Sequence, residues 1–489
     1  MTETLDGRSS MLGDATAVMS AARAAAREWR AVPVAERASL VGRLRCEVVG
    51  ARADIARTIC GEAGKTEIEA LLSDILPTLE ILRYLEEHAA GILRSQARRT
   101  PFIYRASRSH VEYRPRGVVL VIAPWNNPLQ LALVPAASAL VAGNAVILKP
   151  SERTPATGAL VGQLCERAGL TSGQVRIAAG GPDVARALID ERPDMVFFTG
   201  GPAGGRAVLA AAAQHLIPVV LELGGKDPMI VFADADLDRA ARAAVYGAFA
   251  HAGQHCISTK RLYVDAAIHD AFLARVADET RRVSATGDWG RATDARGLDA
   301  AREQVREALA SGARLLAPDD ESKAGAEPTL LADVTHAMRI AHEETFAPVL
   351  AAMPFADEAE AVRLANDTPF GLNASVWSRD LARARRVVEG LETGNAYINN
   401  VLINAGNPTL PFGGVKASGF GRNHGPEGIR AFCTETSVME CTSSQAAEPH
   451  WFPHDEAQRG AADELIALRH DGRGPLKRLW GWLRLLWKL

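Results

Sequence analysis

The sequence predicts an α/β protein in which helices cover both faces of a mainly parallel sheet. From residue 118 onward, short apolar runs alternate with stretches of helical composition. The runs are continuous rather than alternating, which is typical of strands buried on both faces. We expect strands at 118–124, 145–150, 175–180, 195–200 and 218–225, and helices at 129–142, 154–168, 182–190 and 202–214. A second α/β region is expected from about 229 to 411.

The segments on either side have a different texture. Residues 14–95 are rich in Ala, Arg, Glu and Leu, with no proline between Pro33 and Pro77, which predicts helices. Residues 101–117 are aromatic and alternating, which predicts an exposed hairpin or edge strand. After about residue 445 the α/β rhythm ends, and we expect a polar linker.

Composition and charge restrict the class of protein. A chain of 489 residues is too long for one core, so two or three domains are expected. The net charge of -3 gives no electrostatic reason to expect nucleic acid as a partner. The 6 cysteines lack a C-x-x-C pair or zinc-ligand spacing, which predicts reduced thiols and no metal site. No secretory signal and no run of ~18 apolar residues is present, so we expect a cytoplasmic protein.

Three motifs place polar or reactive groups in turns or at the ends of predicted strands. Cys256 lies in the Gly/Gln-rich segment AGQHCIS, where the alternative to a reactive thiol is a buried structural cysteine. Glu222 ends the strand of LELGGK, at the edge where parallel sheets bind ligands, although a solvated strand end is the alternative. Asn126 in APWNNP also follows a strand, and a plain turn would explain it equally well.

Together the motifs resemble those of the aldehyde dehydrogenase superfamily. PWN-x-P, KP-S-E, FTG, E-L-G-G-K, G-Q-x-C, E-E-x-F-x-P and P-F-G-G-x-K-x-S-G occur in that order between residues 123 and 422. The resemblance implies an aldehyde dehydrogenase fold with a Rossmann-type cofactor domain, an α/β catalytic domain and a small β oligomerisation element. The short spacing from Cys256 to Glu344 and the little sequence before the first helices are similar to the compact class-3 and fatty-aldehyde members.

The resemblance also implies a domain plan and an assembly. The expected parts are a cofactor domain (1–100 and 118–222), a catalytic domain (223–411), an oligomerisation or bridging element (101–117 and 412–445), and a linker with an amphipathic tail (446–489). An unpaired strand edge is usually completed by a partner subunit, so a homodimer is expected, with a tetramer as the alternative.

The resemblance assigns the chemistry to three residues. Cys256 would be the nucleophile that adds to an aldehyde and, after hydride transfer to NAD(P)⁺, carries a thioester. The Asn126 amide would join the Cys256 backbone N–H in an oxyanion hole. Glu222 would be the general base that activates the water for thioester hydrolysis, giving the carboxylic acid.

The cofactor contacts are implied in the same way. Lys149 and Glu152 would hold the adenosine ribose, and because Glu152 would repel a 2′-phosphate, NAD⁺ is expected in preference to NADP⁺. A helix N-terminus would face the pyrophosphate, although ordinary packing is the alternative for the glycines there. The family's usual Ser after FTG is replaced by glycine here, followed by proline. The expected cofactor-binding residues are Trp125, Lys149, Ser151, Glu152, Gly200, Gly201, Gly205, Leu223, Gly224, Glu344 and Phe346.

The substrate pocket is expected to include Asn127, His255, Ile257 and Phe412. His255 is interpreted as a wall or packing residue rather than a base, because the family varies at that position. Residues 475–489, PLKRLWGWLRLLWKL, have the pattern of a basic amphipathic helix rich in Trp. Such a helix would either anchor the protein peripherally to a membrane or dock on a partner subunit or the substrate mouth, with disorder as a third alternative. Either active role favours an apolar aldehyde of long-chain or aromatic type.

Other activities are compatible with part of the pattern. A CoA-acylating or semialdehyde dehydrogenase of the same superfamily is the first alternative, and the presence of Glu222 speaks against the acylating one. A non-enzymatic scaffold is the second, and the presence of Cys256 and Asn126 speaks against it.

Overall fold

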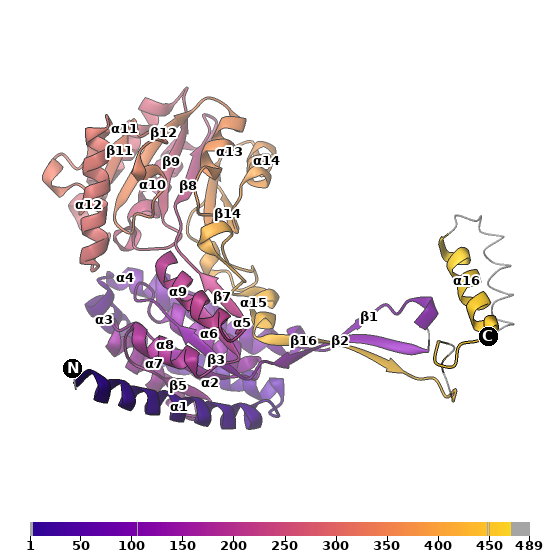
Figure 1. Ribbon diagram of the computed structural model, residues 1–489. Coiled ribbons are helices and arrows are strands. Elements are labelled where there is room, and N and C mark those ends of the chain that lie inside the picture. The colour runs from indigo at the N-terminus through magenta and orange to yellow at the C-terminus, as the bar shows by residue number, and fades with distance from the viewer. Residues whose placement is uncertain (1–2, 105, 447, 449, 471–489) are drawn as a thin grey trace. The chain divides into compact units, whose positions relative to one another are not determined.

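The computed structural model describes residues 3–104, 106–446, 448 and 450–470 (Figure 1). The chain divides into a larger unit, Met1–Arg94 with Glu112–Thr436, and a smaller unit, Ser95–Val111 with Ser437–Leu489. The predicted amphipathic tail at 475–489 lies outside the described residues. None of the described helices is long and apolar enough to cross a membrane.

The larger unit contains a six-stranded sheet in the order β15-β7-β6-β3-β4-β5. Its strands are β3 Val118–Ile122, β4 Ala145–Lys149, β5 Val175–Ile177, β6 Met195–Thr199, β7 Val219–Glu222 and β15 Gly419–Phe420. Neighbours pair in parallel except β15, which is antiparallel to β7. The chain moves outward from β3 through β4 to β5 and then returns to the other side of β3. The turns after β3 and β6 therefore meet at a switch point, where open α/β sheets bind ligands.

Two helical layers cover this sheet (Figure 1). Val119 and Val121 of β3 belong to a core with α2, α5, α6 and α7, whereas Leu120 belongs to a core with α1, α8 and α9. Burial on both faces explains why the predicted strands are continuously apolar. The helices are α1 Glu3–Trp29, α2 Val34–Gly50, α3 Arg52–Ala63, α4 Glu67–Ala70, α5 Leu76–Ile92, α6 Gln130–Val141, α7 Pro155–Arg167, α8 Pro182–Asp190 and α9 Pro202–Ala213, with a π-helical turn at Leu71–Ile75. The strand and helix predictions for 118–225 are confirmed.

A seven-stranded sheet follows, in the order β10-β11-β12-β9-β8-β13-β14. Only the pair β10–β11 is antiparallel among these neighbours. The strands are β8 Asp227–Val231, β9 Thr259–Asp265, β10 Arg314–Ala317, β11 Thr329–Ala332, β12 Val349–Phe355, β13 Asn373–Trp377 and β14 Asn395–Ile398. The helices that belong to this region or follow it are α10 Leu237–Phe249, α11 His269–Thr286, α12 Ala295–Ala310, α13 Glu358–Asn366, α14 Leu381–Gly390 and α15 Gly425–Ala431.

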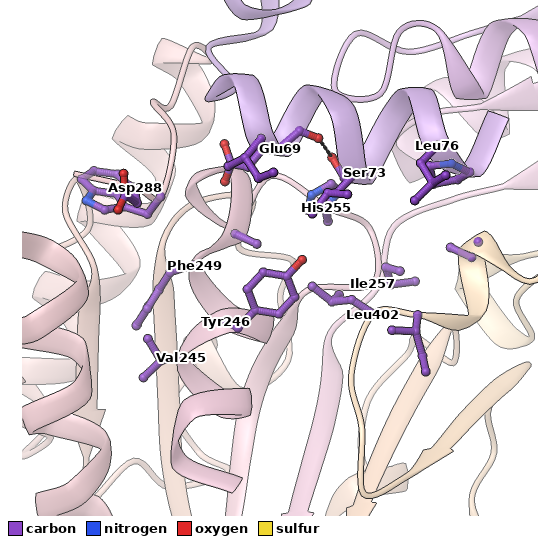
Figure 2. Close-up of a pocket in the computed structure, with 18 of the residues that line it drawn as sticks. Glu69, Ser73, Leu76, Val245, Tyr246, Phe249, His255, Ile257, Asp288 and Leu402 are labelled. Atoms are coloured by element: carbon purple, nitrogen blue, oxygen red, sulfur yellow. Dashed lines mark hydrogen bonds between the residues drawn. The ribbon is translucent and has the colours of Figure 1, made fainter. Parts of the chain in front are cut away.

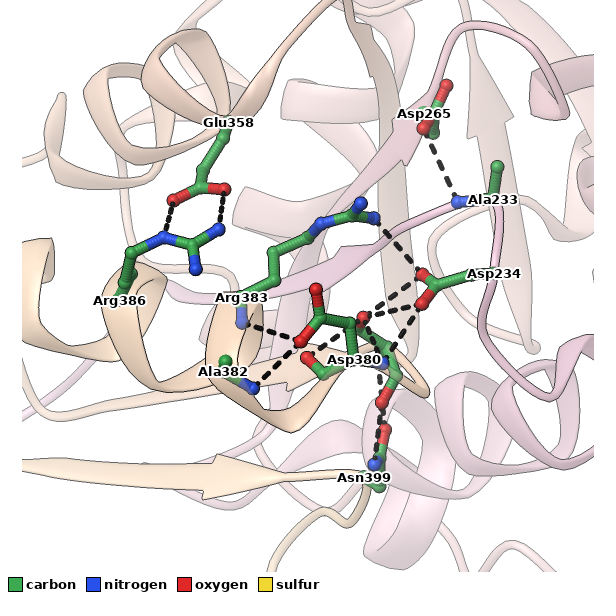
Figure 3. Close-up of polar contacts among 10 residues, drawn as sticks. Ala233, Asp234, Asp265, Glu358, Asp380, Ala382, Arg383, Arg386 and Asn399 are labelled. Atoms are coloured by element: carbon green, nitrogen blue, oxygen red, sulfur yellow. Dashed lines mark hydrogen bonds and ion pairs between the residues drawn. The ribbon is translucent and has the colours of Figure 1, made fainter.

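A polar network fixes the start of α14 to the segment after β8 (Figure 3). The Asp234 carboxylate accepts hydrogen bonds from the Ser378 hydroxyl at 2.9 Å and the Asp380 backbone N–H at 3.0 Å, and it pairs with Arg383 at 3.3 Å. Asp380 in turn caps α14 through the backbone N–H of Ala382 at 2.9 Å. None of these residues belongs to the chemistry-bearing motifs, so we interpret the network as structural.

The smaller unit is described by itself. Strand β1, Gln96–Arg98, pairs antiparallel with β2, Ser107–Pro115, and β2 also neighbours β16, Cys433–Cys441. The segment 101–117, predicted to be a hairpin or an edge strand, contains among its described residues the single strand β2, which pairs with β1 outside that range and is the middle strand of its sheet. Residues Glu456–His470, expected to be linker, form helix α16. The Asp455 carboxylate accepts from the Gln458 N–H at 2.8 Å, a capping contact that starts a helix in a largely polar segment.

Candidate active site

Cys256 lies in the loop between α10 and β9 and is partly exposed. Hydrogen bonds on both sides hold this loop. The Ser258 hydroxyl donates to the Gly247 carbonyl at 2.9 Å, and the Lys260 ammonium donates to the carbonyls of Gly253 at 2.9 Å and Ala347 at 2.7 Å. These contacts brace the turn that carries the partly exposed Cys256, which favours the reactive interpretation.

Glu222 ends β7 and is buried close to this loop. The approach is visible at Gly225, where a Cβ atom would lie 2.7 Å from the Cys256 carbonyl oxygen. Within the described residues, Oε1 of Glu222 has no hydrogen-bond partner. Burial raises the pKa of this carboxyl to about 8, although Arg422 opposes the shift. A carboxyl with a raised pKa and a free oxygen suits proton transfer near neutral pH.

The thiol lies among acidic groups. Burial, followed by the carboxyls of Asp227, Glu222 and Glu344, raises the pKa of Cys256 above its ordinary value. A raised pKa favours the neutral thiol at neutral pH. Its sulfur becomes a strong nucleophile only as the proton leaves.

Asn126 follows β3 and is buried. Its side-chain amide donates to the carbonyl of Gln254 at 2.9 Å, which brings the two loops together across the site. An amide NH₂ carries two hydrogens, so one remains for a second acceptor. Asn126 and the Cys256 turn are therefore assembled as an oxyanion hole requires.

Lys149 and Glu152 meet at the carboxyl end of β4. The Lys149 ammonium lies 3.3 Å from the Glu152 carboxylate and donates to the Gly180 carbonyl at 2.6 Å. Lys149 is buried, whereas the Glu152 side chain is 49% exposed and open to a ligand. Ser151 accepts from the Arg153 N–H at 3.2 Å and so supports the turn.

The predicted glycines have separate roles. Gly201 caps α9, and a Cβ there would meet open space, so this helix N-terminus is accessible. A Cβ at Gly205 would lie 2.6 Å from the Leu223 side chain, which supports the packing alternative for Gly205. A Cβ at Gly200 would meet the Phe198 ring, and at Gly224 it would meet the Glu344 carboxylate.

Trp125 and Phe346 join the two halves of the predicted cofactor site. Their ring centroids are 5.9 Å apart in an edge-on arrangement, and the Arg153 guanidinium lies over the Trp125 ring at 4.3 Å. Glu344 accepts from the Gly225 N–H, and burial raises its pKa to about 7. An open helix N-terminus, a half-exposed carboxylate and this aromatic corner along one sheet edge fit a dinucleotide.

A cavity of about 820 Å³ reaches the residues that flank Cys256 (Figure 2). Asn127, His255 and Ile257, which were expected in the substrate pocket, are among its lining residues. Phe412 instead packs with Cys256, Ile257 and Leu372 in a small apolar cluster and is not among the lining residues. Most of the wall is apolar, and its exposed hydrophobic side chains are Ile68, Leu72, Leu76, Tyr246 and Ile403.

Sequence reasoning missed a buried polar chain behind this wall. The Lys65 ammonium contacts the Asp74 carboxylate at 3.3 Å and the Asn127 side-chain oxygen, and the Asn127 amide nitrogen lies 3.3 Å from His255 Nδ1. Lys65 lies in the connection between α3 and α4, and Asp74 lies in the π-helical turn; both residues look solvent-facing in sequence. Only the π-helical turn and the packing of α4 and α5 against the Asn127 loop reveal the connection.

Comparisons with known proteins agree with this geometry. The aldehyde dehydrogenase family model matches residues 7–438. The chain is 46% identical to a 4,4'-diapolycopene aldehyde oxidase from a Methylomonas species, over 89% of this chain and 83% of that protein. A salicylaldehyde dehydrogenase from Pseudomonas putida G7, solved with salicylaldehyde, is 33% identical with a TM-score of 0.84, covering 90% of this chain and 92% of that one. Betaine aldehyde dehydrogenase from Staphylococcus aureus, solved with NAD⁺, is 31% identical with a TM-score of 0.82, covering 90% and 89%.

The chain therefore belongs to the aldehyde dehydrogenase family, whose members are oxidoreductases acting on aldehydes. The predicted family and fold are confirmed.

Proposed function

We propose that this protein oxidises extended, apolar aldehydes to carboxylic acids with NAD(P)⁺, through a thioester on Cys256. The observation that carries the proposal is the apolar cavity, which reaches both neighbours of Cys256 in the chain. Relatives named for aldehyde oxidation and a related structure that contains NAD⁺ support the reaction and the cofactor.

The acylation half of the reaction uses Cys256 and Asn126. The sulfur bonds to the aldehyde carbon while the thiol proton leaves to water, and the carbonyl oxygen becomes an oxyanion. The free Asn126 amide hydrogen and the Cys256 backbone N–H stabilise that charge. Because both donors are neutral and already held in place, they stabilise the adduct without reorganisation.

NAD(P)⁺, when bound, supplies the electron-pair acceptor that converts the adduct to a thioester. Lys149 and Glu152 would hold its adenosine end, and the Gly201 end of α9 would face its pyrophosphate. Phe346 and Glu344 would hold the end nearer Cys256.

Hydrolysis of the thioester falls to Glu222. In its ionised form the free Oε1 accepts a proton from water, whose oxygen bonds to the acyl carbon while the Cys256 sulfur leaves. The raised pKa makes this carboxylate a stronger base than an exposed glutamate. CoA is not required as acceptor in this scheme.

The preference for extended apolar substrates comes from the outer wall of the cavity. Ile68, Leu72 and Leu76 lie at successive helical turns and all line it, although each is 45% to 56% exposed. Exposed apolar patches mark interaction sites, including ligand-binding grooves, and this stripe lines a cavity. The stripe is about 12 Å long at 1.5 Å per residue, which suits a long chain more than a small aldehyde.

This preference can be tested with a variant in which a larger side chain narrows the cavity. Leu72→Trp is expected to lower kcat/KM for a long alkanal at least tenfold while leaving propanal within about twofold, since a short chain does not reach the stripe. Leu381→Trp is the matched control, because Leu381 is also about half-exposed but does not line the cavity. Equal losses for both aldehydes in Leu72→Trp would contradict the proposed substrate class.

We also propose a homodimer assembled through the smaller unit. This unit exposes Phe102, Tyr104 and Met439 beside the three-stranded sheet, which suits burial against a second copy. Peripheral membrane contact through 475–489 remains a proposal based on its basic, Trp-rich pattern.

A further inference from the structure

The side-chain ammonium group of Lys65 is fully buried. An ammonium carries three N–H donors and no acceptor. It has three partners: the Ser73 hydroxyl at 3.0 Å, the Asp74 carboxylate at 3.3 Å and the Asn127 side-chain oxygen. Ser73 is the acceptor in its contact, because its own hydrogen is donated to the Glu69 carbonyl at 2.7 Å. The three donors of Lys65 are therefore matched by three acceptors.

This arrangement fixes the orientation of the Asn127 amide. If the amide were rotated by half a turn, its NH₂ group would face the Lys65 ammonium, donor against donor, in a buried site. The oxygen must therefore face Lys65, and the NH₂ group faces Nδ1 of His255 at 3.3 Å. Asp74 is itself held by the Gln130 N–H at 2.7 Å, which keeps the chain of contacts anchored.

The orientation of Asn127 in turn fixes the tautomer of His255. Because the amide donates, Nδ1 must accept and carries no hydrogen. Burial, then the charges of Lys65 and Lys260, lower the pKa of His255 to about 3, so the ring is neutral. A neutral imidazole without a hydrogen on Nδ1 carries it on Nε2.

The Nε2–H of His255 has no acceptor in the part of the chain that the structure describes. In the same part of the chain, Nε2 is not one of the fully buried polar atoms that lack a hydrogen-bond partner. The His255 ring also lines the cavity. A chain of contacts that served packing alone would end on a protein acceptor. This one ends on a donor available to a ligand, next to the nucleophile in sequence and in a cavity with mainly apolar walls.

We propose that the chain Asp74–Lys65–Asn127 holds His255 as a hydrogen-bond donor to a second oxygen of the substrate, close to its aldehyde group. This inference rests on the proposed function and refines it. The preferred substrate is apolar over most of its length and carries one acceptor oxygen, such as an ether or hydroxyl, near the reacting carbon. His255 is then a specificity-determining residue, and Lys65 is a positioning residue that acts through Asn127.

The test compares 2-methoxybenzaldehyde with 2-ethylbenzaldehyde, which have similar shapes but differ in the acceptor oxygen. The ratio of their kcat/KM values is measured in the unaltered protein and in His255→Phe, so intrinsic reactivity cancels between proteins. One neutral hydrogen bond corresponds to about a fivefold change. We expect the ratio to fall about fivefold in His255→Phe, through a higher KM for the methoxy aldehyde.

Two further variants separate this role from packing. His255→Gln keeps an N–H donor at similar reach and is expected to restore most of the ratio. The double variant Lys65→Met with Asp74→Asn removes the buried charges together and frees the Asn127 amide to turn, so the ratio is expected to fall as in His255→Phe. Turnover of both aldehydes with an unchanged ratio in His255→Phe would overturn the inference alone. Absence of turnover by the unaltered protein of both benzaldehydes and of a long alkanal would contradict the proposed function and remove the ground for the inference.

Discussion

The raised pKa of Glu222 predicts a specific pH dependence of thioester hydrolysis. With a pKa of about 8, about one tenth of the carboxyl is ionised at pH 7 and about nine tenths at pH 9. Only the ionised form accepts a proton from water, so the hydrolysis rate is expected to rise about tenfold between these pH values. The sign follows from burial, which disfavours the carboxylate and moves its titration upward from the ordinary range.

The assay separates hydrolysis from acylation. Rapid mixing with NAD⁺ and aldehyde gives a burst of NADH from acylation, followed by a steady rate that reports hydrolysis when hydrolysis is slower. Glu222→Gln is expected to keep the burst and lose the steady rate at every pH. Glu344→Gln is the control, because burial also raises the pKa of Glu344, to about 7. The increase of the steady rate between pH 7 and pH 9 is expected to remain in this variant. A steady rate independent of pH between 7 and 9, or one that persists in Glu222→Gln, would refute the reasoning.

Three other predictions follow from the site and the smaller unit. Asn126→Ala is expected to lower the acylation rate by ~10²–10³, as for loss of one oxyanion donor, and an unchanged burst rate would count against that role. Glu152 is expected to give NAD⁺ a higher kcat/KM than NADP⁺, and Glu152→Gln should narrow the difference; a clear preference for NADP⁺ in the unaltered protein would be inconsistent with this contact. Light scattering is expected to give twice the chain mass of 52.2 kDa, whereas a monomer mass at micromolar concentration would exclude the dimer.

The fold of the larger unit could be predicted because the sequence patterns that indicate its strands and helices are local. Runs such as Val118–Ile122 are buried on both faces, and the helices between them begin and end near proline or glycine, as at Pro202. The smaller unit was harder to predict. Whether β2 is an edge or a central strand depends on β16, which lies far away in the sequence. Helix α16 has only a short apolar pattern, so its sequence resembles that of a linker. The capping contact of Asp455 is evident only in the structure.

Some residues of the candidate site could be predicted from the sequence and others could not. Cys256, Glu222 and Asn126 stand in motifs whose order is visible in the sequence, and the structure brings them together. The buried Lys65 could not be found, because a lysine in a short polar connection between helices gives no sign of burial in the sequence. The packing role of Gly205 was likewise invisible, since it depends on the Leu223 side chain from another segment.

The central claim is that the aldehyde becomes a thioester on Cys256, and mass spectrometry of the trapped intermediate tests it most directly. Glu222→Gln would be mixed with NAD⁺ and decanal, quenched in acid and digested. The account predicts a decanoyl group on the peptide that contains Cys256, in an amount that matches the NADH burst. No such adduct is expected without NAD⁺ or in Glu222→Gln combined with Cys256→Ala. A burst of NADH without acyl modification, or with the acyl group on another cysteine, would contradict the claim.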